Sequence, residues 1–188
     1  HLVAYHLDEG PEYDGVMDLA KAAIERVGAR GGIDMDIESE APSGSGLGGS
    51  SALVTAVVAG LAMLSGRACS ADELARLSYA IERDDLGISG GWQDQYAAAY
   101  GGLNLLEFGR GGVTATAVQV DDAVIARLRS NLLLCYTGHV RRNVGLIDAQ
   151  IELFRTGRED TLLGMKQLRE MAYAMRDALE AGDADRLG

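Results

Sequence analysis

The sequence has little proline and little cysteine, and it lacks an apolar run long enough to cross a membrane. Only 2 of its 188 residues are proline, whereas 25 are glycine, and the glycines follow no repeat. Glycines in this number are typical of tight turns and of places where the backbone closely approaches a ligand. The two cysteines, Cys69 and Cys135, have no metal-ligand spacing. They favour a reducing compartment, with both thiols packed as small core residues.

The longest nearly apolar stretch, residues 52–64, is shorter than the roughly 20 residues that a membrane-spanning helix needs. No basic segment followed by an apolar one opens the chain, as it would in a signal peptide. We therefore expect a cytoplasmic location and no membrane partner. The first residue is His1 rather than Met, which leaves open that the chain begins in the middle of a domain.

The net charge is acidic, with 17 basic and 28 acidic residues giving a formal charge of −11. This balance opposes binding to nucleic acid or to an anionic membrane, although a local basic pocket remains open. A length of 188 residues, 47% of them hydrophobic and 24% charged, excludes a disulfide-stapled miniprotein and compositional disorder. It fits one domain, or one domain and part of a second.

Hydrophobic periodicity predicts an alternation of helices and short strands. Helices are expected over residues 14–27, 52–64, 70–83, 96–100, 123–129, 144–154 and 160–181. Strands are expected over residues 32–40, 103–108, 113–120 and 131–137, with the second and third forming a hairpin and the last one buried. Ser70 and Glu73 form a candidate capping box, and Gly28 follows the first helix. The methionine-rich stripe of the last helix predicts core packing.

A glycine-rich loop, APSGSGLGGSS over residues 41–51, leads from a predicted strand into an apolar helix. Such a loop presents unpaired N–H groups and the positive end of the helix dipole, so it suits a phosphate group. It lacks the lysine of a Walker A loop. The alternative is a plain strand-to-helix turn. Its candidate phosphate-binding residues are Gly44, Gly46, Leu47, Gly48, Gly49, Ser50 and Ser51.

Ser50 and Ser51 allow two interpretations. At least one of them is expected to cap the helix, and a hydroxyl there could also hold a phosphate oxygen or Mg²⁺.

Acidic residues gather around a polar loop that follows the next helix: Glu82, Asp84, Asp85 and Asp94. They are either a solvated surface or a set in which one carboxylate binds Mg²⁺ and another contacts an acceptor hydroxyl. Asp94 could also cap a short helix. Trp92, the only tryptophan, either packs in the core or walls a substrate pocket.

A basic loop follows the predicted strand at residues 131–137. Gly138, Arg141 and Arg142 lie in it, and the two arginines could clamp an anionic substrate. The alternative is a solvated turn.

Two segments resemble the GHMP kinase superfamily. Residues 42–52, PSGSGLGGSSA, resemble its phosphate-binding motif PxxxGLGSSAA, with Gly49 as an additional glycine. Residues 90–108, GGWQDQYAAAYGGLNLLEF, include the segment that carries the family's catalytic aspartate, and they most resemble heptose 7-phosphate kinases, followed by fucokinases.

This resemblance implies an α+β fold of the GHMP kinase type. Residues 1–120 would form an ATP-binding domain like the second domain of ribosomal protein S5, and residues 121–188 would begin a ferredoxin-like domain. The cofactors would be ATP and Mg²⁺, with Asp94 as the catalytic residue and with Ser51 and Glu82 as Mg²⁺ ligands. Trp92, Gln93, Gly138, Arg141 and Arg142 are the candidate substrate contacts.

The function that the resemblance implies is transfer of the ATP γ-phosphate to a hydroxyl, expected to be anomeric, of a sugar or sugar phosphate. The family's first and third motifs have no match, and the only lysines, Lys21 and Lys166, lie in predicted helices. The chain is therefore expected to be a fragment or a shortened relative. A non-catalytic nucleotide- or sugar-binding module, a fucokinase-like or other small-molecule kinase, a purely structural domain and a homodimer all stay open.

Overall fold

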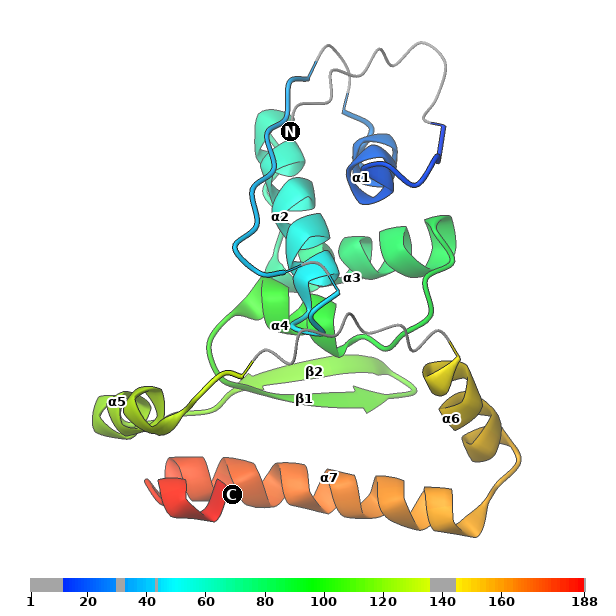
Figure 1. Ribbon diagram of the computed structural model, residues 1–188. Coiled ribbons are helices and arrows are strands. Elements are labelled where there is room, and N and C mark those ends of the chain that lie inside the picture. Colours follow the sequence, from blue (N-terminus) through cyan, green and yellow to red (C-terminus); the bar gives the residue numbers. More distant parts are fainter. Residues whose placement is uncertain (1–11, 30–32, 43, 136–144, 188) are drawn as a thin grey trace. The chain divides into compact units, whose positions relative to one another are not determined.

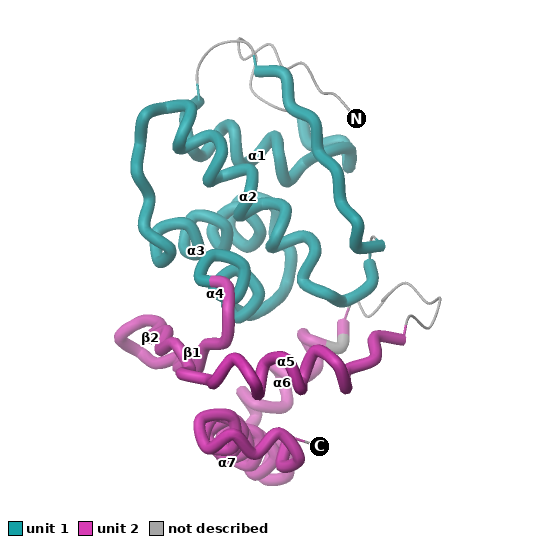
Figure 2. Tube along the Cα trace, turned by 90° about the vertical axis from the view of Figure 1, so that its left-hand side faces the viewer, with its two compact units in different colours: residues 1–100, 139–142 teal, residues 101–138, 143–188 magenta. Residues whose placement is uncertain are grey.

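The computed structural model describes residues 12–29, 33–42, 44–135 and 145–187. The chain separates into two compact units, the first comprising residues 1–100 and 139–142 and the second the remainder (Figure 2). The regular structure of the described residues consists of helices and one antiparallel hairpin, which agrees with the predicted α+β class. The predicted domain boundary at residue 120 stays a prediction. No helix in the described ranges has the length and apolar character needed to cross a membrane.

The first unit is helical. Its elements are α1 (Asp18–Val27), α2 (Gly49–Leu64), α3 (Ala71–Ala80), the π-helical turn η2 (Ile81–Asp85) and α4 (Gln93–Tyr100). The apolar helix α2 packs against α1, α3 and α4 (Figure 1).

Local signals in the sequence explain where these helices begin and end. α1 stops at Gly28, which adopts the left-handed conformation with φ 70°. α3 starts with the predicted capping box, in which the Ser70 side chain accepts from the Glu73 N–H at 3.2 Å and the Glu73 carboxylate accepts from the Ser70 N–H at 2.9 Å. Both predictions are confirmed.

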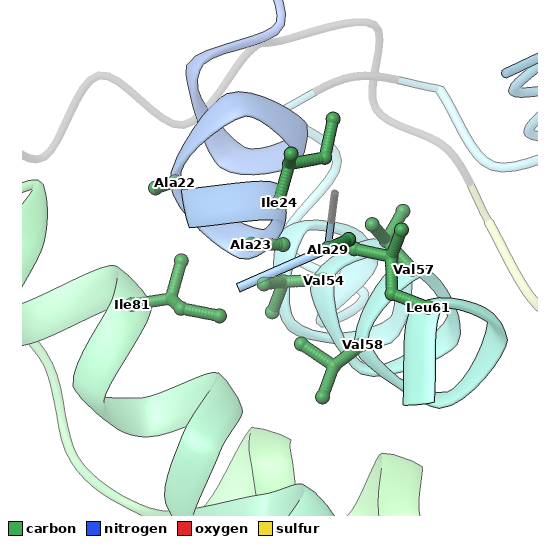
Figure 3. Packing of buried hydrophobic residues seen from close by; sticks show 9 residues of the cluster. All are labelled: Ala22, Ala23, Ile24, Ala29, Val54, Val57, Val58, Leu61 and Ile81. Carbon is green, nitrogen blue, oxygen red and sulfur yellow. The ribbon is translucent and has the colours of Figure 1, made fainter. Parts of the chain in front are cut away.

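The hydrophobic core of this unit lies between α1, α2 and η2. Figure 3 shows members of this cluster, among them Val54, Val58 and Leu61 of α2 and Ile81 of η2. These four side chains are at most 1% exposed. Burial of apolar surface on this scale stabilises the packing of the three elements.

The strand predicted over residues 32–40 does not form in the described residues. Residues 33–40 are extended, with Ile33, Met35 and Ile37 half-buried against the core cluster and the acidic residues between them exposed, so the alternation is real. A strand also needs a hydrogen-bonded neighbour; in the described parts of the chain this segment has only an isolated bridge at Ile33, and the only ladder is the hairpin of the second unit.

The second unit contains the hairpin and three helices. The elements are β1 (Asn104–Gly109), β2 (Gly112–Ala117), α5 (Asp122–Asn131), α6 (Leu146–Arg155), α7 (Glu159–Glu180) and the 3₁₀ turn η3 (Ala184–Leu187). β1 and β2 pair in antiparallel register from Asn104 opposite Ala117 to Gly109 opposite Gly112, which confirms the predicted hairpin. α7 packs against α6, β1 and η3.

Three predictions for apolar residues are wrong in the described structure. Residues 132–135 form no strand, and Leu133 is 96% exposed. The methionine stripe of α7 is exposed too, with Met165 at 52% and Met175 at 45%. Cys69 is half-buried and Cys135 is exposed, so neither thiol is a core residue. Periodicity selects the apolar face of an element, but only an opposing surface can bury it.

Candidate functional site

The glycine-rich loop forms the entrance to α2. Gly44, Gly46 and Gly48 adopt left-handed backbone conformations with φ 70°, 79° and 71°, which residues other than glycine rarely adopt. Gly48 occupies the N-cap position, so the helix starts at Gly49. Within the described residues no side chain caps this terminus, and the N–H groups of a first helical turn have no partner within the helix. These groups suit an anion.

Ser50 and Ser51 do not cap α2, contrary to the expectation for at least one of them. Their hydroxyls instead donate to the carboxylate of Glu82, Ser50 Oγ to Oε1 at 2.9 Å and Ser51 Oγ to Oε2 at 2.8 Å. The reason is positional: the helix begins at Gly49, which places both serines inside the first turn rather than before it. The site residue Glu82 is thereby joined to the predicted phosphate loop.

The π-helical turn η2 carries Glu82. It continues α3 directly, and its wider turn is closed by the Leu86 N–H donating to the Ile81 carbonyl at 3.1 Å. π-Helical turns are rare and frequently lie at functional sites. In this turn Glu82 is 1% exposed, although it bears a carboxylate.

Glu82 is buried among neutral donors. Besides the two serines, the side-chain amide of Gln95 donates to its Oε2. In the described parts of the chain no lysine or arginine forms an ion pair with Glu82. A buried carboxylate is costly without a compensating positive charge. This environment therefore suits a bound cation.

Asp94 lies beside the glycine-rich loop. It belongs to the first turn of α4, which begins at Gln93, so it is not the cap of that helix. A Cβ atom placed on Gly48 would lie 3.8 Å from Asp94 Cγ. The Asp94 side chain is exposed. The fold thus brings together a carboxylate and a loop that are 46 positions apart in the sequence.

Trp92 and Gln93 lie directly before Asp94. The Trp92 ring stacks on Tyr79, with centroids 3.4 Å apart and an interplanar angle of 3°, and a tilted Tyr96 ring lies 6.1 Å away. Trp92 is half-buried and Gln93 is exposed. One face of the tryptophan therefore packs within the protein.

The remaining residues named by the sequence analysis lie outside the described residues or away from the glycine-rich loop. Gly138, Arg141 and Arg142 lie outside the described residues. Asp85 forms a two-pronged ion pair with Arg26 of α1, at 2.5 and 2.6 Å, and Asp84 is exposed. Asp85 thus serves to join α1 to η2.

Sequence reasoning missed Gln95. Its side chain is fully buried, and its Oε1 atom is buried without a hydrogen-bond partner among the described residues. Its position next to Asp94, in the segment that resembles the kinase family, was the one available signal. Nothing in a single polar residue of a short helix predicts that it is buried.

A hydrogen bond also joins α4 to α3. The Tyr96 hydroxyl donates to Asp72 at 2.8 Å, and Arg76 donates to the same carboxylate at 2.6 Å. Burial, followed by the bond to Asp72, raises the pKa of Tyr96 to about 12. The bond from Arg76, followed by that from Tyr96, lowers the pKa of Asp72. These contacts anchor the helix that carries Asp94.

The donor set of the site is incomplete for a metal held by protein alone. No cluster of three or more histidine, cysteine, aspartate or glutamate residues occurs in the described ranges. Mg²⁺ commonly binds through one or two carboxylates together with the phosphates of a substrate. Ser51 and Glu82 therefore fit Mg²⁺ that arrives with a phosphate ligand.

Residues 15–102 match the GHMP kinases N terminal domain. This range includes the glycine-rich loop, η2 and Asp94. The matched residues therefore form a GHMP kinase N-terminal domain, in agreement with the α+β class.

Sugar kinases are among the relatives that match most of the chain. A D-glycero-α-D-manno-heptose 7-phosphate kinase of Campylobacter jejuni is 33% identical over 176 residues, which cover 90% of this chain and 51% of the relative. A bifunctional fucokinase/GDP-fucose pyrophosphorylase of Arabidopsis thaliana is 30% identical over 160 residues, which cover 84% of this chain and 15% of the relative.

A solved structure has the same fold. The crystal structure of a D-glycero-D-manno-heptose 1-phosphate kinase from Bacteroides thetaiotaomicron superposes with a TM-score of 0.70 at 30% identity, covering 92% of this chain and 52% of that one. The chain thus spans about half the length of the heptose phosphate kinases that it matches.

Proposed function

We propose that this chain is the nucleotide-binding part of an ATP-dependent sugar kinase, which transfers the γ-phosphate to a hydroxyl of a sugar or sugar phosphate. The expected substrate is of the heptose 7-phosphate type, with the anomeric hydroxyl as acceptor. The kinship with heptose phosphate kinase and fucokinase supports this class.

The observation that carries the proposal is the position of Asp94 beside Gly48. A phosphoryl transfer needs mainly positioning and charge neutralisation. Gly48 is the last residue before α2 in the loop that would bind the phosphates, so the nearby Asp94 carboxylate supports a role for Asp94 at the acceptor hydroxyl. Asp94 would orient that hydroxyl and accept its proton.

The ATP phosphates would bind in the loop of residues 44–51. Gly44, Gly46 and Gly48 shape the loop, and the N–H groups of Gly49, Ser50 and Ser51 lie at the positive end of the α2 dipole. The loop binds anions through backbone groups, so the acidic net charge of the chain is no obstacle.

Ser51 and Glu82 would hold Mg²⁺. Bound Mg²⁺ supplies neutralisation of the charge on the phosphate oxygens. Because the Ser51 hydroxyl donates its proton to Glu82, the lone pairs of its oxygen stay available to a ligand. The buried charge of Glu82 adds attraction for a cation at this position.

Substrate contacts are proposed for Trp92, Gln93, Gly138, Arg141 and Arg142. Trp92 and Gln93 precede Asp94 directly, which supports their assignment. Two adjacent guanidinium groups suit the phosphate of a sugar phosphate. The free cysteines Cys69 and Cys135 support a reducing, cytoplasmic location.

Calorimetry and an ADP-release assay test this function. We expect Mg-ATP to bind, and D-glycero-D-manno-heptose 7-phosphate to stimulate ADP release more than L-fucose does. Mg-ATP binding without sugar-dependent ADP release would instead favour a non-catalytic nucleotide-binding module. A chain that does not bind Mg-ATP would contradict both functions and leave a structural domain.

A further inference from the structure

The segment that leads into Asp94 is fastened to Arg83. Arg83 Nη1 donates to the Ile88 carbonyl at 2.9 Å, and Nη2 donates to the Gly91 carbonyl at 3.2 Å. A guanidinium group is planar and presents its donors in a fixed fork, so two carbonyls bound to it are held in a defined relation to each other. Arg83 therefore determines the path of residues 86–92, which end where α4 begins.

Gly90 fits against the same guanidinium group. A Cβ atom at this position would lie 2.5 Å from Arg83 Nη2 and 2.8 Å from Cζ, closer than real contacts allow. Gly90 is not among the glycines with positive φ, so its backbone does not itself require glycine. A side chain at residue 90 would therefore have to displace the guanidinium group, the far end of Arg83, from its present position.

Two aromatic rings complete this arrangement. Arg83 Cζ lies 5.7 Å from the centroid of the Tyr79 ring, and Tyr79 stacks on Trp92 at 3.4 Å. Both contacts are of the favourable kind, cation–π and parallel stacking. We call Arg83, Tyr79, Gly90 and Trp92 the arginine clamp. Trp92 is two positions before Asp94, so the clamp reaches the start of α4.

The π-helical turn η2 carries two neighbouring residues that contact different parts of the site. Glu82 binds the serines of the phosphate loop, whereas Arg83 binds the segment that precedes Asp94. The Ile88 N–H also donates to the Glu82 carbonyl at 2.8 Å. One rigid turn therefore sets the two sides of the site relative to each other.

We propose that Arg83 is a positioning residue for phosphoryl transfer, holding residues 86–92 so that Asp94 lies beside Gly48. This inference rests on the proposed function. Within the described residues the contacts of Arg83 lie in the clamp and at Ile88 and Gly91, outside the phosphate loop. Loss of Arg83 should therefore affect turnover and leave nucleotide binding intact.

The test compares Arg83→Met with Arg67→Met in the full chain. Arg67 is a matched control because it pairs with Glu73 on the surface, at 3.7 Å, with half of its side chain exposed. We expect R83M to lower kcat for sugar-dependent ADP release by about tenfold or more, since small misplacements of reacting groups are costly. Mg-ATP affinity should stay within about twofold, and R67M should leave both quantities unchanged.

Gly90→Ala supplies an independent test from the other side of the same contact. The added methyl group must displace the guanidinium, so G90A should reproduce the loss of kcat seen in R83M. In the double variant the two losses should not multiply, because both substitutions act on one interaction. Trp92 is the only tryptophan, so its emission reports the state of the clamp in each variant. It should shift in R83M and G90A but not in R67M.

The outcomes separate this inference from the proposed function. Wild-type protein that binds Mg-ATP but does not turn over would overturn the proposed kinase function and, with it, the positioning role. If the wild type turns over, an R83M kcat equal to wild type would overturn only the role of Arg83. A parallel loss of Mg-ATP affinity and kcat in R83M, or multiplicative losses in the double variant, would also contradict it. Arg83→Lys keeps the charge without the fork and should recover little of the lost kcat.

Discussion

The two units of the chain treat their apolar side chains differently. In the first unit α1, α2 and η2 enclose a cluster in which Val54, Val58 and Ile81 are fully buried. In the second unit Leu133 and Leu168 are 96% and 66% exposed, and Ala178 is the only buried hydrophobic residue among those described. Both units contain helices with a clear apolar stripe.

The comparison shows that an apolar stripe predicts which face of a helix can be buried, not whether it is buried. α1 meets α2 along its stripe, so Ala23 and Ile24 lose contact with water. In α7, by contrast, Met165 and Met175 belong to the apolar stripe and are exposed. The same difference applies to function, because the described candidate site depends on elements held together by the first core.

Substitution of Asp94 should have the largest effect. Asp94→Asn keeps the shape of the side chain but removes the group that accepts a proton, so sugar-dependent ADP release should fall by about 10²- to 10⁴-fold. Mg-ATP affinity should change little. Asp148→Asn, on the exposed surface of α6, is the matched control and should retain wild-type turnover. Wild-type turnover in D94N would show that Asp94 is not the catalytic residue.

Removal of the buried carboxylate should destabilise the first unit. Glu82→Ala leaves the hydroxyls of Ser50 and Ser51 and the amide of Gln95 without their acceptor. We expect the free energy of unfolding to fall by about 3 kcal/mol, since the Ser51 and Gln95 donors are buried and each buried unsatisfied donor is costly, whereas the exposed Ser50 hydroxyl can bond to water. Urea denaturation measures this change. Glu180→Ala, on the exposed end of α7, should stay within about 0.5 kcal/mol of wild type.

Two leucine-to-alanine substitutions test the comparison of the units directly. Leu61→Ala opens a cavity in the first core, where the side chain is 1% exposed, and should cost about 2–4 kcal/mol. Leu168→Ala, at 66% exposure, should cost less than about 0.5 kcal/mol. Equal losses in urea denaturation would show that the stripe of α7 is buried in solution.

The smallest expected effect is on stability at high pH. The pKa of Tyr96 is raised to about 12, so the folded protein disfavours ionisation of the Tyr96 hydroxyl. The contribution of the neutral hydroxyl to the free energy of unfolding is fully present below about pH 10, the ordinary pKa of a tyrosine. It is lost as the pH rises toward 12. Tyr96→Phe should therefore flatten the fall of the melting temperature between pH 10 and 12.

Tyr173 provides the control for this pH effect. Its pKa is also raised, chiefly by the hydrogen bond to Glu107, but the pair is exposed. Tyr173→Phe should leave the alkaline profile nearly unchanged. An equal flattening in both variants would contradict the assignment of the effect to the buried ring.

The sequence predicted local structure well where short-range signals decide it. The capping box of Ser70 and Glu73, the end of α1 at Gly28 and the hairpin all follow from neighbouring residues. The extended segment at residues 33–40 shows the limit of such signals. Its alternation is correct, but a strand exists only with a partner, and partners are distant in the sequence.

The sequence by itself determined the chemistry available to the site. It supplied a glycine-rich loop, two serines, a glutamate and an aspartate, in segments that resemble a kinase family. Tertiary structure alone decided their relations. The serines donate to Glu82 instead of capping α2, Gln95 is buried against that carboxylate, and Arg83 holds the segment before Asp94. These relations arise from the packing of α2, η2 and α4, and packing joins residues that no local periodicity connects.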